Sequence, residues 1–243
     1  MKFTKLPVNV FKKIQLNAGI ILSSFDPSTE TVTQSNIIGA TSGGVNFTAT
    51  PNYSDFGEDI DNCPKNTKEL KKLDDWTVTM SGTFVAVSTE LAKTLVGSGS
   101  VTPGTATYAL TSDTDIVAGK TYYTRSGTSP DYVYTAVVSP VKSSLSSYYE
   151  VTSTSADKIT PRGDVAQSDF ETIWWVGDYS DENGESGGGF VAIKLINGLS
   201  TGGFQIQSSD KSKGTFSFEF TGHYSMADTS VVPFEIYIKE GLA

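Results

Sequence analysis

The chain has 243 residues, of which 37% are hydrophobic and 19% are charged, so a packed core can form and global disorder is excluded. Its formal net charge of −9 argues against a nucleic-acid-binding protein, because phosphate affinity comes mainly from Lys and Arg. The single cysteine, Cys63, excludes an intramolecular disulfide framework and a cluster of thiolate metal ligands.

The N-terminal residues carry positive charge, but no long apolar segment follows them. The first apolar run, 18–22, contains Gly19 and is too short for a signal sequence or a membrane span. We therefore expect no membrane partner, and a chain that is made and folded in a reducing cytoplasm.

Alternation of apolar and polar residues is the main structural signal along the chain. This period is typical of antiparallel strands with one face in the core and one facing solvent or a partner. It predicts strands at 16–22, 36–49, 76–87, 190–197, 203–207, 214–224 and 234–239, and a hairpin of 120–125 with 131–138.

One helix is expected at 89–96. Ser88 is a suitable N-cap, Glu90 falls in the first turn, and Gly97 can end the helix in a left-handed conformation. A short helical turn is also expected at 66–72. The predicted fold class is therefore all-β, with one or two short helices.

Residues 51–74 are predicted to form a long charged loop, acidic first and then basic. A structureless loop of this length inside a compact domain tends to be functional. Its charge order would suit a head-to-tail contact with another copy of the chain, although a merely solvated loop explains the pattern equally well. The loop residues concerned are Tyr53, Asp55, Phe56, Glu58, Asp59, Asp61, Lys65, Lys68, Lys71 and Lys72.

Aromatic usage marks an insertion at 102–153. All 13 Phe and all three Trp lie outside this range, whereas seven of the 11 Tyr lie inside it. Tyr has a polar tip, which suits thin and hydrated β modules. Linker-like sequences flank the range at 97–100 and 153–156. We predict a Tyr-rich β module inserted in a host domain made of 1–101 and 154–243.

Residues for common enzyme chemistry are missing. The one histidine, His223, is expected on the polar face of a strand, where a solvated or interface role is favoured over catalysis. The sequence 119–121 resembles the end of a phosphate-binding loop, but Thr114 stands where that loop needs glycine. The acidic residues Asp178, Asp181, Glu182 and Glu185 lack EF-hand spacing, so a solvated hairpin tip is favoured over a calcium site. We expect no catalytic residue, no metal and no cofactor.

The order of these elements resembles that of the major tail tube proteins of long non-contractile-tailed phages. The resemblance covers roughly residues 14–97 and 157–240. The inserted module resembles small β inserts in structural proteins of gut phages. The segments that carry the resemblance are Gly19–Leu22, Ile38–Phe47, the charged loop, Trp76–Val87, Thr89–Val96, Gly214–Tyr224 and Pro233–Lys239.

The resemblance implies a two-sheet antiparallel β-sandwich, barrel-like, with a flanking helix. Its copies would form sixfold rings that stack into a tube in the virion tail, assembled in the cytoplasm of the bacterial host. The loop at 48–75 would mediate ring stacking. The implied partners are further copies of the chain, the tape measure, tail terminator and distal tail proteins, and DNA that passes through without being bound.

In such a tube, the free faces of strands 76–87 and 214–224 are candidates for lining the lumen. None of their residues is Lys or Arg, so they would not hold phosphate. The candidates are Thr77, Thr79, Ser81, Thr83, Ser217, Glu219 and Thr221.

The alternative interpretation is a carbohydrate-binding or adhesin-like β-sandwich. An exposed Trp174-Trp175 pair and the Tyr-rich module could stack on sugars. The lack of a signal-like segment weighs against this alternative. An enzyme on a β scaffold is disfavoured because no site for catalysis is recognisable.

Overall fold

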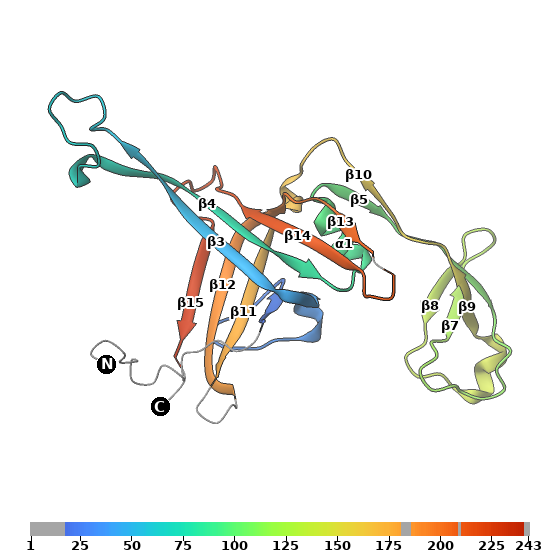
Figure 1. The fold of residues 1–243 in the computed structure, drawn as a ribbon. Helices are drawn as coiled ribbons and strands as arrows, with labels where there is room; N and C mark the ends of the chain where they lie inside the picture. The colour runs from blue at the N-terminus through green and yellow to red at the C-terminus, as the bar shows by residue number, and fades with distance from the viewer. Residues whose placement is uncertain (1–17, 181–185, 209, 241–243) are drawn as a thin grey trace. The chain divides into compact units, whose positions relative to one another are not determined.

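The computed structural model describes residues 18–180, 186–208 and 210–240 (Figure 1). The chain forms two compact units, unit 1 (1–100 and 161–243) and unit 2 (101–160). Regular structure is mostly antiparallel β, which confirms the predicted all-β fold class. The insertion expected at 102–153 lies within unit 2, and unit 2 extends seven residues beyond it, to Thr160.

Nine strands of unit 1 form one continuous sheet in the order β2-β1-β11-β12-β14-β4-β3, with β13 beside β14 and β15 beside β12. Their bounds are β1 (Ile20–Leu22), β2 (Ile37–Gly39), β3 (Thr41–Asp55), β4 (Lys71–Phe84), β11 (Glu171–Ser180), β12 (Ser186–Ser200), β13 (Gln205–Gln207), β14 (Thr215–Gly222) and β15 (Phe234–Lys239).

The long strand β12 joins two layers of this sheet. Its residues 190–195 pair with β15, and its residues 198–200 pair with β14. Strands β3, β4 and β14 therefore run across β11, β12 and β15, as Figure 1 shows. The sandwich-like arrangement is confirmed, and hydrogen bonding makes its two layers parts of a single sheet.

The main core of unit 1 is formed by the inward faces of both layers and by helix α1 (Thr89–Val96). Its buried residues are Ile21, Val78, Met80, Phe84, Leu91, Leu95, Ile173, Trp175, Ile193, Leu195, Phe218 and Phe220. A second cluster lies on the other face of β11 and β12, and contains Leu22, Phe25, Trp174, Val176, Phe190 and Ala192.

Strand β11 is buried on both faces because successive side chains enter different clusters. The run 173–176 is therefore continuously apolar and shows no alternation, so this strand cannot be predicted from a period of two residues. Trp174 and Trp175 are only 6% and 7% exposed. The expectation that this pair is exposed is therefore wrong.

Helix α1 is confirmed with the predicted caps. The Ser88 hydroxyl accepts a hydrogen bond from the Leu91 N–H at 3.2 Å, and Gly97 ends the helix with φ of 81°. Ser200 donates to the Leu95 carbonyl at 2.8 Å, which ties the last turn to β12. The helical turn expected at 66–72 is the 3-10 turn η3 (Lys68–Leu70). Further 3-10 turns are η2 (Gln34–Asn36) and η5 (Gln167–Asp169).

Unit 2 contains a four-stranded antiparallel sheet with the order β6-β9-β7-β8. Its elements are β6 (Ala106–Leu110), β7 (Tyr123–Ser126), β8 (Val133–Ala136), the 3-10 turn η4 (Lys142–Ser147) and β9 (Tyr149–Thr154). Tyr122, Leu145 and Tyr148 form its buried cluster. The chain enters and leaves through a two-stranded ribbon of β5 (Gly99–Thr102) and β10 (Lys158–Pro161).

The loop predicted at 51–74 is the end of a β-hairpin with a long turn, so its description as structureless is wrong for 51–55 and 71–74. Pairing of β3 with β4 continues to Asp55 opposite Lys71, and only 56–70 form the turn. Strand β14 pairs with β4 no further than Thr221 opposite Thr79, so the hairpin continues beyond it as a two-stranded ribbon. A ribbon with no face in the core shows no alternation of apolar and polar residues, so its charged sequence cannot be distinguished from that of a loop.

Candidate functional site

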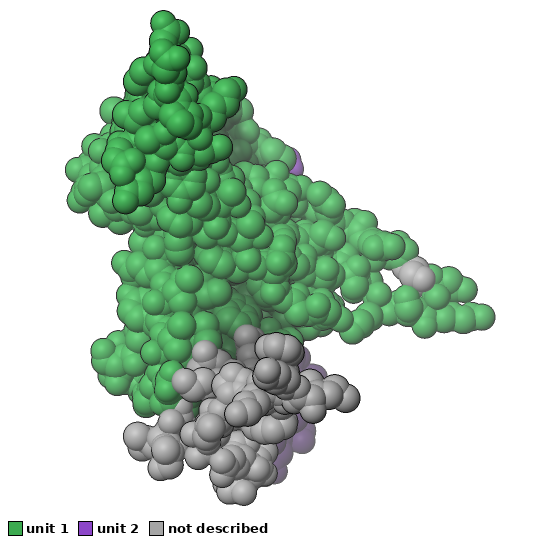
Figure 2. Space-filling model, turned by 60° about the vertical axis from the view of Figure 1, so that its left-hand side comes forward, with its two compact units in different colours: residues 1–100, 161–243 green, residues 101–160 purple. Residues whose placement is uncertain are grey.

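We call residues 51–75 the arm. It leaves the sheet at Trp76 and stands out from the rest of unit 1 (Figures 1 and 2). The Tyr224 hydroxyl accepts the Trp76 N–H at 2.8 Å, where β14 no longer offers a carbonyl. The Trp76 ring packs edge-on against Phe234, with 5.4 Å between centroids. These two contacts fix the base of the arm to the sheet.

The tip of the arm is organised around Asp55. Its carboxylate accepts the N–H of Gly57 at 2.9 Å and the N–H of Asn66 at 2.8 Å. These hydrogen bonds, with the charges of Lys71 and Lys65, hold the pKa of Asp55 below its usual value. The lowered pKa favours the ionised carboxylate, which joins Gly57 and Asn66 near the two ends of the turn through these hydrogen bonds.

Apolar side chains are exposed along the arm. Tyr53 and Leu73 lie directly opposite each other on its two strands, and are 57% and 43% exposed. At the tip, Phe56 and Ile60 are 59% and 49% exposed. A single exposed apolar residue is normal on a protein surface, but four on one narrow projection indicate an interaction site.

All ten residues predicted for ring stacking lie on the arm, but their charges are not separated in space as they are in sequence. The hairpin folds back on itself, so acidic Asp55 lies opposite basic Lys71. Lys65 lies 4.0 Å from Glu58, and both side chains are exposed. Exposed ion pairs are weak, so these charges remain available to a partner. The arm therefore does not have one acidic end and one basic end, although the order of charges in the sequence is acidic and then basic.

The seven residues predicted to line a lumen share one face of the sheet. Across β4 and β14, the directly opposite pairs are Thr79 and Thr221, Ser81 and Glu219, and Thr83 and Ser217; Thr77 follows next to them on β4.

Strand β3 extends this polar face. Asn46, Thr48 and Thr50 lie opposite Ser81, Thr79 and Thr77. These three residues are not among the predicted lumen residues, although their alternation with Val45, Phe47 and Ala49 is a usable signal in the sequence. We call these ten residues of β3, β4 and β14 the polar face. It contains hydroxyl and amide groups and the carboxylate of Glu219, and none of the ten is Lys or Arg.

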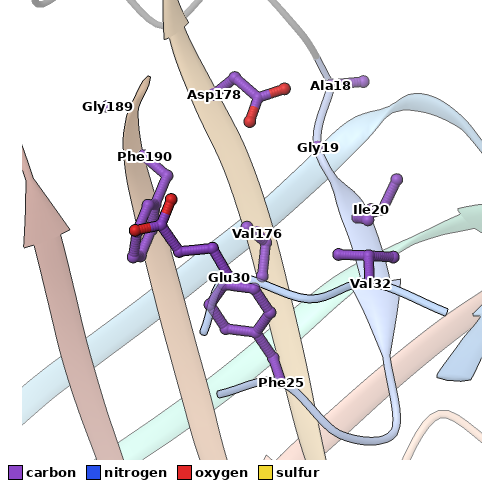
Figure 3. A pocket seen from close by; sticks show the side chains of 10 residues that line it. All are labelled: Ala18, Gly19, Ile20, Phe25, Glu30, Val32, Val176, Asp178, Gly189 and Phe190. Carbon is purple, nitrogen blue, oxygen red and sulfur yellow. The ribbon is translucent and has the colours of Figure 1, made fainter. Parts of the chain in front are cut away.

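A cavity of about 420 Å³ lies beside β1, β11 and β12 (Figure 3). Phe25 packs edge-on against Phe190 there, with 5.6 Å between ring centroids. Two carboxylates, Glu30 and Asp178, also line the cavity, and Glu30 is paired with Lys239. Among the described residues that line it, none is a histidine, a cysteine or a hydroxyl nucleophile.

Other residues considered for chemistry have structural contacts. His223 packs against Phe170, and its Nδ1 lies 3.2 Å from the Asn197 carbonyl. Lys120, from the sequence that resembled a phosphate-binding loop, is paired with Asp113 and Glu150. No group of three or more metal-ligating side chains occurs among the described residues; Asp181, Glu182 and Glu185 lie outside them.

Within the described part of the chain, no helix is long and apolar enough to cross a membrane. Comparison of the sequence with protein-family models gives no match, and comparison with curated proteins gives none either. The arm and the polar face are therefore interpreted from their geometry and chemistry.

Proposed function

We propose that this chain is a structural subunit of a phage tail tube, and that copies of it form stacked rings through which DNA passes. The observation that carries the proposal is the arm, a projecting hairpin on which Tyr53, Phe56, Ile60 and Leu73 are exposed. Sixfold rings and contacts with tape measure, tail terminator and distal tail proteins follow from the resemblance described above.

The arm has the properties of an intermolecular contact. Complete burial of a large apolar side chain contributes about 1.5–3 kcal/mol relative to exposure. Covering the exposed parts of Tyr53, Phe56, Ile60 and Leu73 would therefore contribute on the order of several kcal/mol for each arm. Because every copy carries the same arm, a head-to-tail contact repeats from ring to ring.

The polar face supports the second half of the proposal, the passage of DNA. A surface that conducts DNA must not retain it, and each Lys or Arg on such a surface would add a phosphate contact. The polar face offers hydroxyl and amide groups and one carboxylate, and none of its ten residues is Lys or Arg. The net charge of −9 also disfavours retention of phosphate.

Assembly of the purified chain tests the proposal. Rings or tubes should appear by electron microscopy, and large species by sedimentation, as the concentration rises. The double variant Phe56→Ser, Ile60→Ser should fold but remain unassembled, whereas the control Val165→Ser, which changes an exposed valine outside the arm, should assemble. A parent chain that stays monomeric across a wide range of salt and concentration would contradict the proposal.

The alternative, a carbohydrate-binding β-sandwich, was based on the Trp174-Trp175 pair and on the Tyr-rich module, and the first of these observations no longer favours it. Trp174 and Trp175 are buried in different clusters and cannot stack on a sugar in this fold. Only the tyrosines of unit 2 still favour the alternative.

A further inference from the structure

One face of the unit 2 sheet is built from tyrosines of all four strands. Tyr108 of β6 stacks on Tyr134 of β8, with 3.9 Å between centroids and 6° between ring planes. Tyr123 of β7 meets Tyr108 edge-on at 5.2 Å, and Tyr149 of β9 meets Tyr134 edge-on at 5.3 Å. Tyr132, two residues before Tyr134, lies on the same side.

These five tyrosines differ from the two tyrosines in the buried cluster of unit 2. The Tyr122 hydroxyl donates to Asp113 at 2.7 Å, and the Tyr148 hydroxyl accepts the Val141 N–H at 3.3 Å. No hydroxyl of the five forms a hydrogen bond with another described residue. The face therefore presents rings whose polar edges are not used by the fold.

Arg125 lies in the same face. Its guanidinium is 4.3 Å from the centroid of Tyr132 and 4.7 Å from that of Tyr149. No carboxylate among the described residues pairs with it, in contrast with Lys120, which binds Asp113 and Glu150. Stacking on aromatic rings orients a guanidinium and leaves its N–H groups available for an anion.

We propose that this tyrosine face binds an acidic polysaccharide, a polymer of pyranose rings that carry carboxylates. The flat C–H faces of the sugars would stack on the rings, and their hydroxyls would bond with the phenols. A sugar carboxylate would pair with the Arg125 guanidinium, which is suited to bidentate contact. The face consists of Tyr108, Tyr123, Arg125, Tyr132, Tyr134 and Tyr149.

Two observations favour an acidic sugar polymer as the ligand. Every aromatic ring of unit 2 is a tyrosine, so each ring brings a hydroxyl that can hydrogen-bond with a sugar hydroxyl. The Arg125 guanidinium, which has no carboxylate partner among the described residues, is complementary to a ligand with negative charge. The proposal concerns unit 2 alone and does not depend on tube assembly by unit 1.

Affinity electrophoresis of the full chain tests the proposal. Native gels would contain polygalacturonate, alginate or hyaluronan, with dextran as the neutral polymer. The chain should be retarded by at least one acidic polymer and not by dextran. Tyr134→Ala and Arg125→Gln should each weaken the retardation at least fivefold, and Arg125→Lys should restore only part of it, because lysine keeps the charge but not the planar stack.

Matched controls come from the opposite face of the same strands. Thr124→Ala and Thr135→Ala are adjacent in sequence to Arg125 and Tyr134, and both should leave the retardation unchanged. If near-ultraviolet circular dichroism shows that Tyr134→Ala disturbs the fold, Tyr132→Ala at the exposed rim replaces it.

Three results would overturn the proposal. The first is no retardation by any acidic polymer, and the second is equal retardation by dextran. The third is unchanged affinity in the tyrosine and Arg125 variants. Self-association that Tyr134→Ala abolishes, without polysaccharide binding, would show that the face is a protein interface.

Discussion

Gly19 directly precedes β1 and lies against the side chain of Trp175. It has φ of 69°, and the indole of Trp175 occupies the space that a Cβ would need. The indole N–H also donates to the Ala18 carbonyl at 3.1 Å, so the ring cannot move without loss of this bond. A side chain placed at this position would therefore meet both backbone strain and overpacking.

We expect Gly19→Ala to lower the free energy of unfolding by about 2–4 kcal/mol, measured by denaturant titration. Gly43→Ala is the matched control, because Gly43 also has positive φ, 81°, but a Cβ at that position would meet no atom within 4 Å. Its cost should be about 1–2 kcal/mol, from strain alone. Equal losses in the two variants would show that the contact with Trp175 is not decisive.

Asp113 links the stability of unit 2 to pH. Hydrogen bonds from Lys120 and Tyr122, each at 2.7 Å, lower the pKa of Asp113. A carboxyl group whose pKa is lower in the folded state than in the unfolded state stabilises the fold when the pH is above the unfolded-state pKa. This contribution is lost as the pH falls through the folded-state pKa. Unit 2 should therefore lose stability as the pH falls from ~5 towards ~2.

The variant Asp113→Asn should show a weaker pH dependence over this window and lower stability at neutral pH. Amide hydrogen exchange of unit 2, measured at several pH values, checks both effects. Asp131→Asn in the exposed turn between β7 and β8 is the control and should behave like the parent. A parent-like pH profile for Asp113→Asn would contradict this assignment.

At the scale of elements, the base of the arm depends on contacts that replace a missing strand. Tyr224→Phe removes the hydroxyl that accepts the Trp76 N–H. A hydrogen bond of this kind contributes about 1 kcal/mol, so the effect should be local. Exchange of the Trp76 amide should become faster while exchange in the β11–β12 ladder stays unchanged, as measured by NMR. Unchanged exchange at Trp76 would mean that the bond does not hold the arm.

The polar face allows a direct test of DNA passage. Thr79 is half-buried and Glu219 is exposed, so Thr79→Lys and Glu219→Lys should fold and assemble. Each lysine would add a phosphate contact, and tubes of these variants should retain DNA more strongly at low salt. DNA retention by assembled tubes and the rate of DNA ejection are the measurements. Parent-like values in both variants would show that this face does not line the channel.

At the scale of the whole molecule, each buried cluster is confined to one unit. The two clusters around β11 and β12 belong to unit 1, and the cluster of Tyr122, Leu145 and Tyr148 belongs to unit 2. Because none of these clusters of described residues combines residues of both units, we expect the two units to fold separately.

Replacing 103–157 with a short Gly-Ser linker should therefore leave unit 1 folded, with its Tm changed by only a few degrees. This replacement keeps the β5–β10 ribbon, which holds the ends of the linker together. The shortened chain should still assemble if the arm alone carries stacking. A large fall in Tm would show that unit 2 contributes to the core of unit 1.

Local signals in the sequence determined much of the fold. Alternation within β4 and β14 predicted which residues face the core, because successive side chains of a strand point to opposite sides. The caps Ser88 and Gly97 predicted α1, because capping depends on residues within one turn of the helix end. Tyrosine usage separated the inserted module because the two units bury different kinds of side chain.

Tertiary structure decided what depends on distant partners. Strand β11 is buried on both faces only because two clusters from elsewhere in the chain cover it. The arm projects from the sheet because the pairing of β14 with β4 ends at Thr79. The sequence of the arm itself does not determine where β14 ends. The free face of each strand could be predicted, but the register that joins β3, β4 and β14 into the polar face is set by pairing between segments far apart in sequence.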